Sequence, residues 1–203
     1  MIAIIDYGLG NIRAFVHVYN QLNIPITIAT ECDGLKKASK LILPGVGAFD
    51  NAMERLNKSG MRQILDELVL GRNVPLLGIC VGMQMLARSS EEGHLPGLGW
   101  MDAVVKKMTP LNFHDTHLPH MGWNDVQPVI KNSLFYDFGR VSRFYFLHSY
   151  YFHCNKNEDV LALTDYGGMF TSAVHSGNIY GVQFHPEKSH TCGIRLLQNF
   201  AEL

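Results

Sequence analysis

The chain has 203 residues, 47% hydrophobic and 17% charged, and this balance excludes intrinsic disorder. Lys and Arg number 17 against 18 Asp and Glu, so the net charge of −1 lacks the basic excess typical of nucleic-acid binders. No repeat or low-complexity linker divides the sequence. We therefore expect a single domain spanning 1–203 and no nucleic-acid partner.

The cysteines and the N-terminal sequence predict a cytoplasmic protein. Cys32, Cys80, Cys154 and Cys192 are widely spaced, which fits neither a disulfide framework nor a zinc ribbon. The first residues lack the basic start and small-residue cleavage site of a signal peptide. No apolar run approaches the roughly 20 residues that span a bilayer, so we expect no membrane association.

In the first half, short apolar runs alternate with segments of helical periodicity, which predicts an α/β fold with a parallel sheet. Pro44 is expected to stop the third strand. The expected strands are 2–5, 25–29, 41–43 and 75–79, and the expected helices cover 12–22, both sides of Gly60, and 83–88.

The second half is richer in strands separated by turn residues, so we expect it to add antiparallel or mixed strands. The expected strands are 100–105, 143–148, 160–164, 171–175 and 179–184, followed by a short helix containing Ile194, Leu197 and Phe200. The predicted architecture is a three-layer α/β sandwich around a mostly parallel sheet.

The pattern Gly-x-Cys-x-Gly at 78–82 stands between an apolar strand and a predicted helix. This is the arrangement of a nucleophile elbow, with the thiol of Cys80 in place of a serine hydroxyl. Side chains at Gly78 and Gly82 would collide with neighbouring backbone in such a turn, and a helix N-terminus favours a thiolate. The alternative is a buried structural cysteine between chance glycines.

His185 follows directly on an apolar strand and is the candidate base for Cys80. Glu187 lies two residues further on, and Pro186 stiffens the link between them. A carboxylate there can hold the imidazole in the tautomer that faces the thiol. The alternative is an exposed His-Pro-Glu turn.

The segment Pro44-Gly45-Val46-Gly47 closes a strand and is placed to present a backbone N–H beside the nucleophile. This N–H, from Val46 or Gly47, and the N–H of Val81 would together form an oxyanion hole. Each such donor is worth roughly 2.7–4 kcal/mol at the transition state. The alternative is an ordinary turn at the end of a strand.

Taken together, these motifs resemble the class I (triad-type) glutamine amidotransferases, a family with a flavodoxin-like fold. Within that family, the chain is most similar to the glutaminase subunits of imidazole glycerol phosphate synthase. The resemblance runs from Met1 to Leu203 and rests on the elbow, the 44–47 loop, the 181–187 segment, and the segments at 6–11, 90–93, 119–124 and 146–150.

The resemblance implies that Cys80 attacks the side-chain amide of L-glutamine, that His185 transfers protons and that Glu187 orients His185. Neither a cofactor nor a metal is expected. The residues that match family positions around the bound glutamine are Gln84, Glu92, Ser149 and Tyr150, with Glu92 pairing with the α-ammonium group.

The resemblance also implies a heterodimer with a cyclase subunit, which is a (β/α)₈ barrel that receives ammonia without its release to solvent and serves histidine biosynthesis. Met121 and Trp123 are large apolar residues suited to anchor an interface, and the alternative is that they are core residues. The residues that match partner-facing positions are Asn11, Met121, Trp123, Tyr145 and Lys188.

Other interpretations remain open. A paralogous glutaminase subunit supplies ammonia for amination of a nucleotide-linked sugar, and the segments 122–126 and 186–190 look somewhat like that branch. A stand-alone cysteine hydrolase would need no partner, and a non-catalytic module would tolerate loss of a triad residue. The spacing His114-x-x-His117-x-x-His120 suggests a metal site, but Pro119 interrupts such a helix, and solvated loop histidines are the expected alternative.

Overall fold

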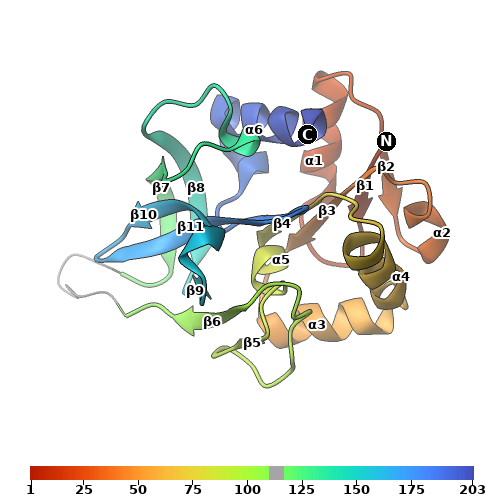
Figure 1. Ribbon diagram of the computed structural model, residues 1–203, viewed down its shortest axis with the longest axis horizontal. Helices are drawn as coiled ribbons and strands as arrows, with labels where there is room; N and C mark the ends of the chain where they lie inside the picture. Colours follow the sequence, from red (N-terminus) through yellow and green to blue (C-terminus); the bar gives the residue numbers. More distant parts are fainter. Residues whose placement is uncertain (110–116) are drawn as a thin grey trace.

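A computed structural model describes residues 1–109 and 117–203, and in these residues the strands form one continuous sheet (Figure 1). In chain order the strands are β1 (Ile2–Ile5), β2 (Ile26–Ala29), β3 (Lys40–Gly45), β4 (Leu76–Cys80), β5 (Ser89–Ser90), β6 (Ala103–Lys107), β7 (His120–Pro128), β8 (Ser142–His148), β9 (Tyr150–Cys154), β10 (Val160–Asp165), β11 (Met169–Ser176) and β12 (Ile179–Val182).

The sheet has a parallel half and an antiparallel half, in the order β2-β1-β3-β4-β12-β11-β10-β7-β8. The strands from β2 to β12 pair in parallel, and β11, β10, β7 and β8 then continue antiparallel. The short strands β5, β6 and β9 branch from β11. The mixed second half that the turn residues predicted is confirmed.

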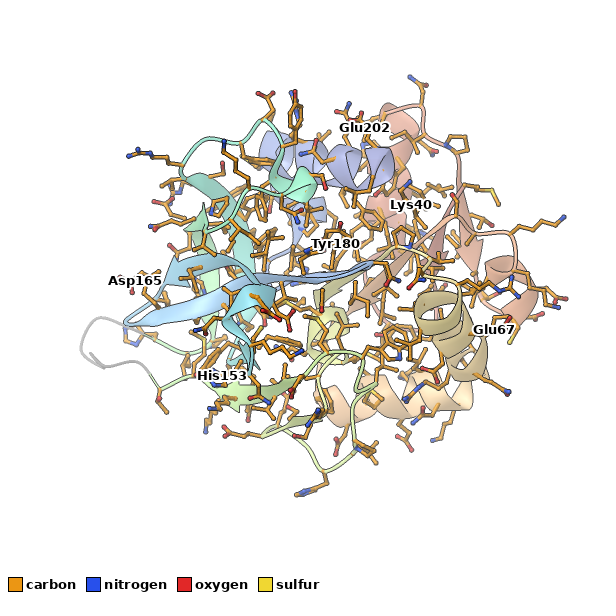
Figure 2. All side chains as sticks on the ribbon, in the orientation of Figure 1. Lys40, Glu67, His153, Asp165, Tyr180 and Glu202 are labelled. Carbon is orange, nitrogen blue, oxygen red and sulfur yellow. The ribbon has the colours of Figure 1, made fainter. Side chains whose placement is uncertain are left out.

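Helices cover both faces of the parallel half, which gives the expected three layers (Figure 1). The helices α1 and α6 lie on one face, where the Tyr19 hydroxyl donates to the Leu197 carbonyl at 3.2 Å, and α3, α4 and α5 lie on the other. Side chains fill the space between the layers (Figure 2). The helices are α1 (Ile12–Gln21), α2 (Cys32–Leu35), α3 (Phe49–Lys58), α4 (Arg62–Asp66) continued by a π turn (Glu67–Gly71), α5 (Val81–Gln84) and α6 (His190–Glu202).

The third strand does not stop at Pro44, as the sequence suggested, but continues to Gly45. On one side, β3 pairs with β1 only up to Ile42, whereas on the other it pairs with β4 as far as Gly45. Pro44 therefore lies where one edge of the strand is unpaired, which is where a residue without an N–H is tolerated.

The helix expected over 83–88 is wrong in both its start and its length. It begins at Val81 and ends after one turn at Gln84. The carbonyls of Met85 and Ala87 accept N–H groups of Leu98 and Gly99, at 2.7 and 3.0 Å, instead of continuing the helical ladder. The loop that follows the elbow is thus tied to the 97–101 segment, and the dipole of so short a helix contributes little to Cys80.

Strands β7 and β9 were not predicted, and β6 begins at Ala103 rather than at Trp100. In β7 the usual polarity is inverted: His120 and Val126 are buried, whereas Met121 and Trp123 are exposed. An apolar side chain at every second position normally marks the buried face, so this strand lacks the usual signal. Trp100 instead donates from its indole nitrogen to an Asp66 carboxylate oxygen at 2.7 Å.

The close contact between α5 and β3 predicts that adding a methyl group at Gly82 destabilises the fold. A Cβ at Gly82 would lie 1.9 Å from the Leu43 carbonyl oxygen, so Gly82→Ala should lower the free energy of unfolding by about 3 kcal/mol. At Gly71, by contrast, no described atom from elsewhere in the chain, beyond its own turn, lies within 4 Å of the position that a Cβ would take. Gly71→Ala should therefore change stability by less than about 1 kcal/mol. Urea denaturation of both variants measures this, and equal effects would contradict the packing described.

Candidate active site

Cys80 lies at the sharp turn between β4 and α5. Its backbone has φ 54° and ψ −114°, which costs a residue with a side chain about 1–3 kcal/mol. Gly45 pairs with Cys80 across the sheet, and a Cβ on Gly45 would lie 2.3 Å from the Gly82 nitrogen. Backbone packing on both sides therefore holds the strained turn, and the thiol faces a cavity.

His185 and Glu187 form a buried pair beside Cys80. Nδ1 of His185 and Oε1 of Glu187 are 2.9 Å apart, and the two side chains are only 4% and 2% exposed. The backbone of His185 is also held at both of its polar groups. Its backbone N–H donates to the Tyr145 carbonyl at 2.8 Å, and its carbonyl accepts from the Ser189 hydroxyl at 2.6 Å. The position and the ring orientation of the imidazole are therefore both fixed.

The protonation of His185 depends on its two partners. Burial by itself lowers the pKa of this imidazole, but hydrogen bonds and charge interactions with Cys80 and Glu187 outweigh burial and raise the pKa from 6.5 to about 10. A proton taken from the thiol is therefore held firmly on His185. An imidazolium held beside a thiol is the arrangement that suits a cysteine nucleophile.

Two further groups contact the thiol. The Leu147 carbonyl oxygen and the Gln183 side-chain nitrogen each lie 3.8 Å from Cys80 Sγ. The carbonyl accepts from the thiol form, whereas the Gln183 amide N–H donates to the sulfur. Gln183 is completely buried, so this donor is shielded from water.

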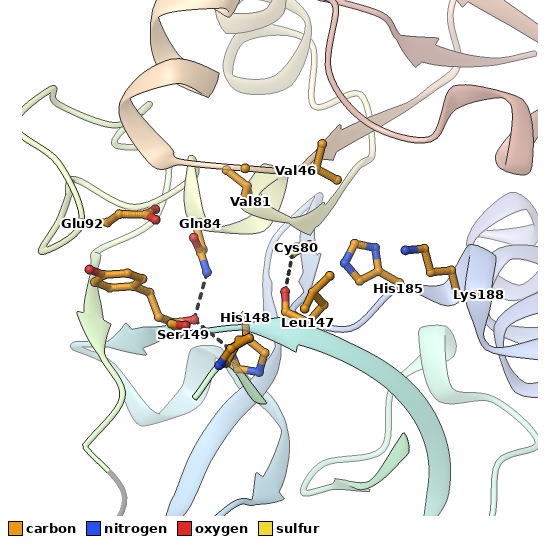
Figure 3. Close-up of a pocket in the computed structure, with 13 residues that line it drawn as sticks. Val46, Cys80, Val81, Gln84, Glu92, Leu147, His148, Ser149, His185 and Lys188 are labelled. Carbon is orange, nitrogen blue, oxygen red and sulfur yellow. Dashed lines mark hydrogen bonds between the residues drawn. The ribbon is translucent and has the colours of Figure 1, made fainter. Parts of the chain in front are cut away.

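A cavity of about 330 Å³ opens beside Cys80, a size that suits a small molecule (Figure 3). It brings together residues from six separate segments of the sequence. Glu187 does not line the cavity and is paired with His185. The lining residues are Val46, Gly47, Cys80, Val81, Gln84, Glu92, Pro119, Leu147, His148, Ser149, Tyr150, His185 and Lys188.

All of the predicted glutamine-binding residues line this cavity, and two of them are already hydrogen-bonded to the protein. One carboxylate oxygen of Glu92 accepts the Phe49 N–H at 2.9 Å, which fixes an anionic group at one end of the cavity. The Gln84 side-chain nitrogen donates to the Tyr150 carbonyl at 3.0 Å and to Gln183 Oε1 at 3.1 Å. The Gln84 side chain thus connects the elbow to β9 and is held in place by these hydrogen bonds.

The predicted oxyanion-hole residues also lie at the cavity. Val46 and Val81 flank Cys80, and Gly47, with φ 82°, follows Val46 (Figure 3). The buried Tyr7 hydroxyl donates to the Pro44 carbonyl at 2.8 Å and so secures the base of the 45–47 loop. Burial, with the nearby Cys80, raises the pKa of Tyr7, so this donor keeps its proton at neutral pH.

The predicted partner-facing residues lie mostly outside the cavity. Met121 and Trp123 are 62% and 41% exposed, so the alternative that they are core residues is wrong. Trp123 meets Tyr145 edge to face, and the Lys188 Nζ lies 5.6 Å from the centre of the Tyr145 ring. Lys188 also lines the cavity, which links this exposed cluster to the site. Asn11 is exposed at the start of α1.

Two residues of the site, Gln183 and His148, were not predicted from the sequence. Gln183 is two residues before His185, at the end of the strand that the sequence predicts over 179–184, and this spacing could have placed both on one side. His148 lines the cavity and bonds to His120, and both are buried. The expectation that His120 is a solvated loop histidine is therefore wrong. A polar residue within the apolar run 144–148 was the available signal for His148.

The remaining candidates do not form a second site in the part of the chain that the structure describes. No group of three or more His, Cys, Asp or Glu side chains there is arranged to hold a metal, and His114 of the proposed histidine spacing lies outside the described residues. Burial, with the charge of Asp159, raises the pKa of Cys154 to about 12, which makes it unreactive. Among residues 1–109 and 117–203, no helix is long and apolar enough to cross a bilayer.

A cysteine on a strand–helix elbow beside a buried His–Glu pair, on an α/β sheet, is the arrangement of triad-type cysteine hydrolases. The family model described as "Glutamine amidotransferase class-I" matches residues 3–203. The chain therefore belongs to the class I glutamine amidotransferase family.

Named relatives align over the whole chain. It is 55% identical to imidazole glycerol phosphate synthase subunit HisH of Bdellovibrio bacteriovorus and 49% identical to that of Leptospira interrogans, with 100% of both chains covered in each case. It is 44% identical to subunit HisH 2 of Pseudomonas aeruginosa, again with 100% of both chains covered.

Solved structures support the fold alone. The structure of PurLQS from Thermotoga maritima matches with a TM-score of 0.73 at 18% identity, covering 99% of this chain and 97% of the other. A crystal structure of a glutamine amidotransferase matches with a TM-score of 0.75 at 19% identity, covering 100% of this chain and 99% of the other. The expected fold class is confirmed.

The buried pair leads to a prediction for Glu187. Cys80 and Glu187 both raise the His185 pKa, and Glu187→Gln keeps the size of the side chain but removes the contribution of the Glu187 charge, so that pKa should fall. Because the nucleophile and the oxyanion donors remain, glutamine turnover should fall by about a hundredfold, less than on loss of the thiol. Imidazole ¹⁵N shifts followed against pH measure the first effect and glutaminase kinetics the second. Full activity in Glu187→Gln would exclude Glu187 from the triad.

Proposed function

We propose that this chain is the glutaminase subunit of an imidazole glycerol phosphate synthase. It hydrolyses L-glutamine to glutamate and delivers the ammonia to a cyclase partner in histidine biosynthesis. The observation that carries the proposal is the strained Cys80 facing the His185–Glu187 pair in a cavity of amino-acid size. Full-length similarity to HisH subunits, at 44–55% identity in the three relatives above, supports the choice of substrate and pathway.

In the first half-reaction, the Cys80 thiolate attacks the side-chain carbonyl carbon of glutamine. The carbonyl oxygen becomes an oxyanion, which the N–H of Val81 and an N–H of the Val46–Gly47 segment would stabilise. The carbon–nitrogen bond then breaks, and the His185 imidazolium donates its proton to the departing nitrogen. The products of this step are ammonia and a γ-glutamyl thioester on Cys80.

In the second half-reaction, water attacks the thioester. His185, now neutral, accepts a proton from this water, and a second oxyanion forms in the same hole. The carbon–sulfur bond breaks, glutamate leaves, and Cys80 and His185 return to their starting states. Glu187 keeps Nδ1 of His185 engaged throughout, so that Nε2 always faces the reacting atoms.

The binding end of the cavity suits an amino acid. Glu92 holds a carboxylate at the lining, where we place the α-ammonium group of glutamine, and Ser149 and Tyr150 line the same wall. The Glu92 carboxylate is oriented before the ligand arrives because Phe49 N–H already occupies one of its oxygens. Such preorganisation lowers the entropic cost of binding.

We propose that the partner binds the outward face of β7. Met121 and Trp123 expose apolar surface there, and Lys188 joins that face to the cavity. Ammonia in neutral water is mostly ammonium, which is not a nucleophile, so a direct passage between subunits keeps the product reactive. We place the (β/α)₈ cyclase on this surface, with Asn11 and Tyr145 at its border, and we expect the heterodimer to work in the cytoplasm with 1–203 acting as one domain.

Replacing the nucleophile separates the two activities of the complex. Cys80→Ser changes the volume of the elbow little, but a hydroxyl is a far weaker nucleophile at neutral pH. Glutamine-dependent formation of imidazole glycerol phosphate, assayed with the cyclase present, should fall by more than about a thousandfold. Formation driven by added ammonium salts should persist. Glutamine-dependent turnover that survives in the variant would refute the assignment of Cys80.

Partner dependence tests the subunit role. Hydrolysis without an acceptor wastes glutamine, so the isolated chain should be poorly active. The glycines at 45 and 47 let the 45–47 peptides rotate, and one misplaced oxyanion donor costs about two to three orders of magnitude in rate. The glutaminase rate is measured for the chain alone, with the barrel, and with the barrel and its nucleotide substrate. Equal rates in all three states would instead favour a stand-alone hydrolase.

A further inference from the structure

A chain of hydrogen bonds runs from the partner strand β7 towards Cys80. It begins at Asn124, whose side-chain nitrogen lies 2.9 Å from the Asp165 carbonyl and 3.1 Å from His120 Nε2. His120 Nδ1 lies 2.9 Å from His148 Nε2, and His148 Nδ1 lies 2.8 Å from the Tyr150 carbonyl. Four elements, β7, β8, β9 and β10, are thereby connected in the interior.

The donor and the acceptor of each hydrogen bond in this series follow from the two groups at its ends, the Asn124 amide and the Tyr150 carbonyl. The Asn124 side-chain oxygen accepts the Asp125 N–H at 2.7 Å and its nitrogen faces the Asp165 carbonyl, so the orientation of the amide is fixed. Its nitrogen donates to His120 Nε2, which must therefore lack a proton.

The same reasoning carries through both imidazoles. Neutral His120 holds its proton on Nδ1 and donates it to His148 Nε2, which must also lack a proton. His148 then holds its proton on Nδ1 and donates it to the Tyr150 carbonyl, which only accepts. Both histidines are neutral and both are in the Nδ1–H tautomer.

The surroundings of the two rings agree with this state. His120 is stacked between Phe146 and Tyr166, with ring centres 4.6 and 3.8 Å away. Burial lowers the pKa of His120 to about 4 and, together with the neighbouring His120, lowers that of His148 to about 3. Neither ring carries a charge at neutral pH, so these hydrogen bonds fix the positions of the side chains without a charged intermediate.

The chain continues past Tyr150 to the nucleophile. The Tyr150 carbonyl also accepts from Gln84 Nε2 at 3.0 Å, and that nitrogen donates its second hydrogen to Gln183 Oε1 at 3.1 Å. Gln183 Nε2 in turn faces Cys80 Sγ at 3.8 Å. Both glutamines are at most 2% exposed, so water does not compete for these bonds.

We propose that Asn124, His120 and His148 are positioning residues for glutamine hydrolysis: their one-way hydrogen-bond chain holds the Tyr150 carbonyl, and through Gln84 and Gln183 it fixes the amide donor on Cys80. Gln183 is then the contact through which the chain reaches the reacting sulfur. Because Asn124 lies on the strand that carries Met121 and Trp123, the chain also joins the proposed partner face to the nucleophile. The inference rests on the proposed glutaminase function.

Asn124→Asp tests the chain with an isosteric change. A carboxylate cannot donate to His120 Nε2, and it meets the Asp165 carbonyl with a second acceptor, so at least one link must break. We expect kcat for glutamine hydrolysis, measured at saturating cyclase barrel, to fall about tenfold, the factor that corresponds to one net hydrogen bond, with a smaller change in KM. Asn57→Asp, an exposed position of α3, is the matched control for the added charge and should leave both constants unchanged.

The tautomers are measured directly by long-range ¹H–¹⁵N correlation of the imidazoles in the full-length protein. In the natural sequence, His120 and His148 should both show a protonated Nδ1 and a bare Nε2. In Asn124→Asp, His120 should leave this state, by moving its proton to Nε2 or by becoming an imidazolium. The measurement on the natural sequence does not depend on activity or on the folding of any variant.

The outcomes separate the two proposals. An Nε2–H tautomer at either histidine in the natural sequence overturns the chain, and so does Asn124→Asp with an altered His120 but an unchanged kcat. A wild-type complex that does not hydrolyse glutamine contradicts the proposed function instead, while the tautomers still decide whether the chain exists. Nδ1–H tautomers at both histidines together with a selective loss of kcat support the positioning role.

Discussion

The site depends on one backbone contact, the approach of the elbow to the end of β3. The positions of Gly45 and Gly82 leave no room for a side chain, because a Cβ at either would lie within 2.3 Å of backbone atoms of the other segment or of Leu43. Between these two glycines the chain turns at Cys80, which has a positive φ. The cost of the strained residue is met by the packing of β3, β4 and α5 around it.

From that turn the other groups follow by topology. β3, β4 and β12 are adjacent and parallel, so their carboxyl ends meet at one edge of the sheet and bring the 45–47 loop, Cys80 and the segment leading to His185 together. The antiparallel strands β8 and β9 close the cavity with Leu147 and Tyr150. The parallel half therefore supplies the groups that we propose react, and the antiparallel half supplies the opposite wall and the face proposed for the partner.

The sequence was sufficient to predict those parts of the fold and the site in which the local residue pattern determines the local structure. The Gly-x-Cys-x-Gly run and the His-Pro-Glu run predicted a cysteine and its base because both stand at the ends of apolar strands. The sequence was insufficient where distant contacts decide: α5 stops after one turn because the 97–101 segment takes its next carbonyls. β7 was missed because it buries His120 and exposes Trp123, and the roles of His148 and Gln183 arise from hydrogen bonds between residues far apart in sequence.

The central claim, that Cys80 is the nucleophile for a glutamine side chain, is tested most directly by covalent trapping. The protein, in complex with the cyclase barrel, is treated with a chloroketone analogue of L-glutamine, and peptides containing each cysteine are quantified by mass spectrometry. The account predicts one equivalent of label on Cys80, prevented by excess glutamine, with Cys32, Cys154 and Cys192 unlabelled. Labelling that follows exposure, with the partly exposed Cys32 and Cys192 modified and Cys80 spared, would contradict it.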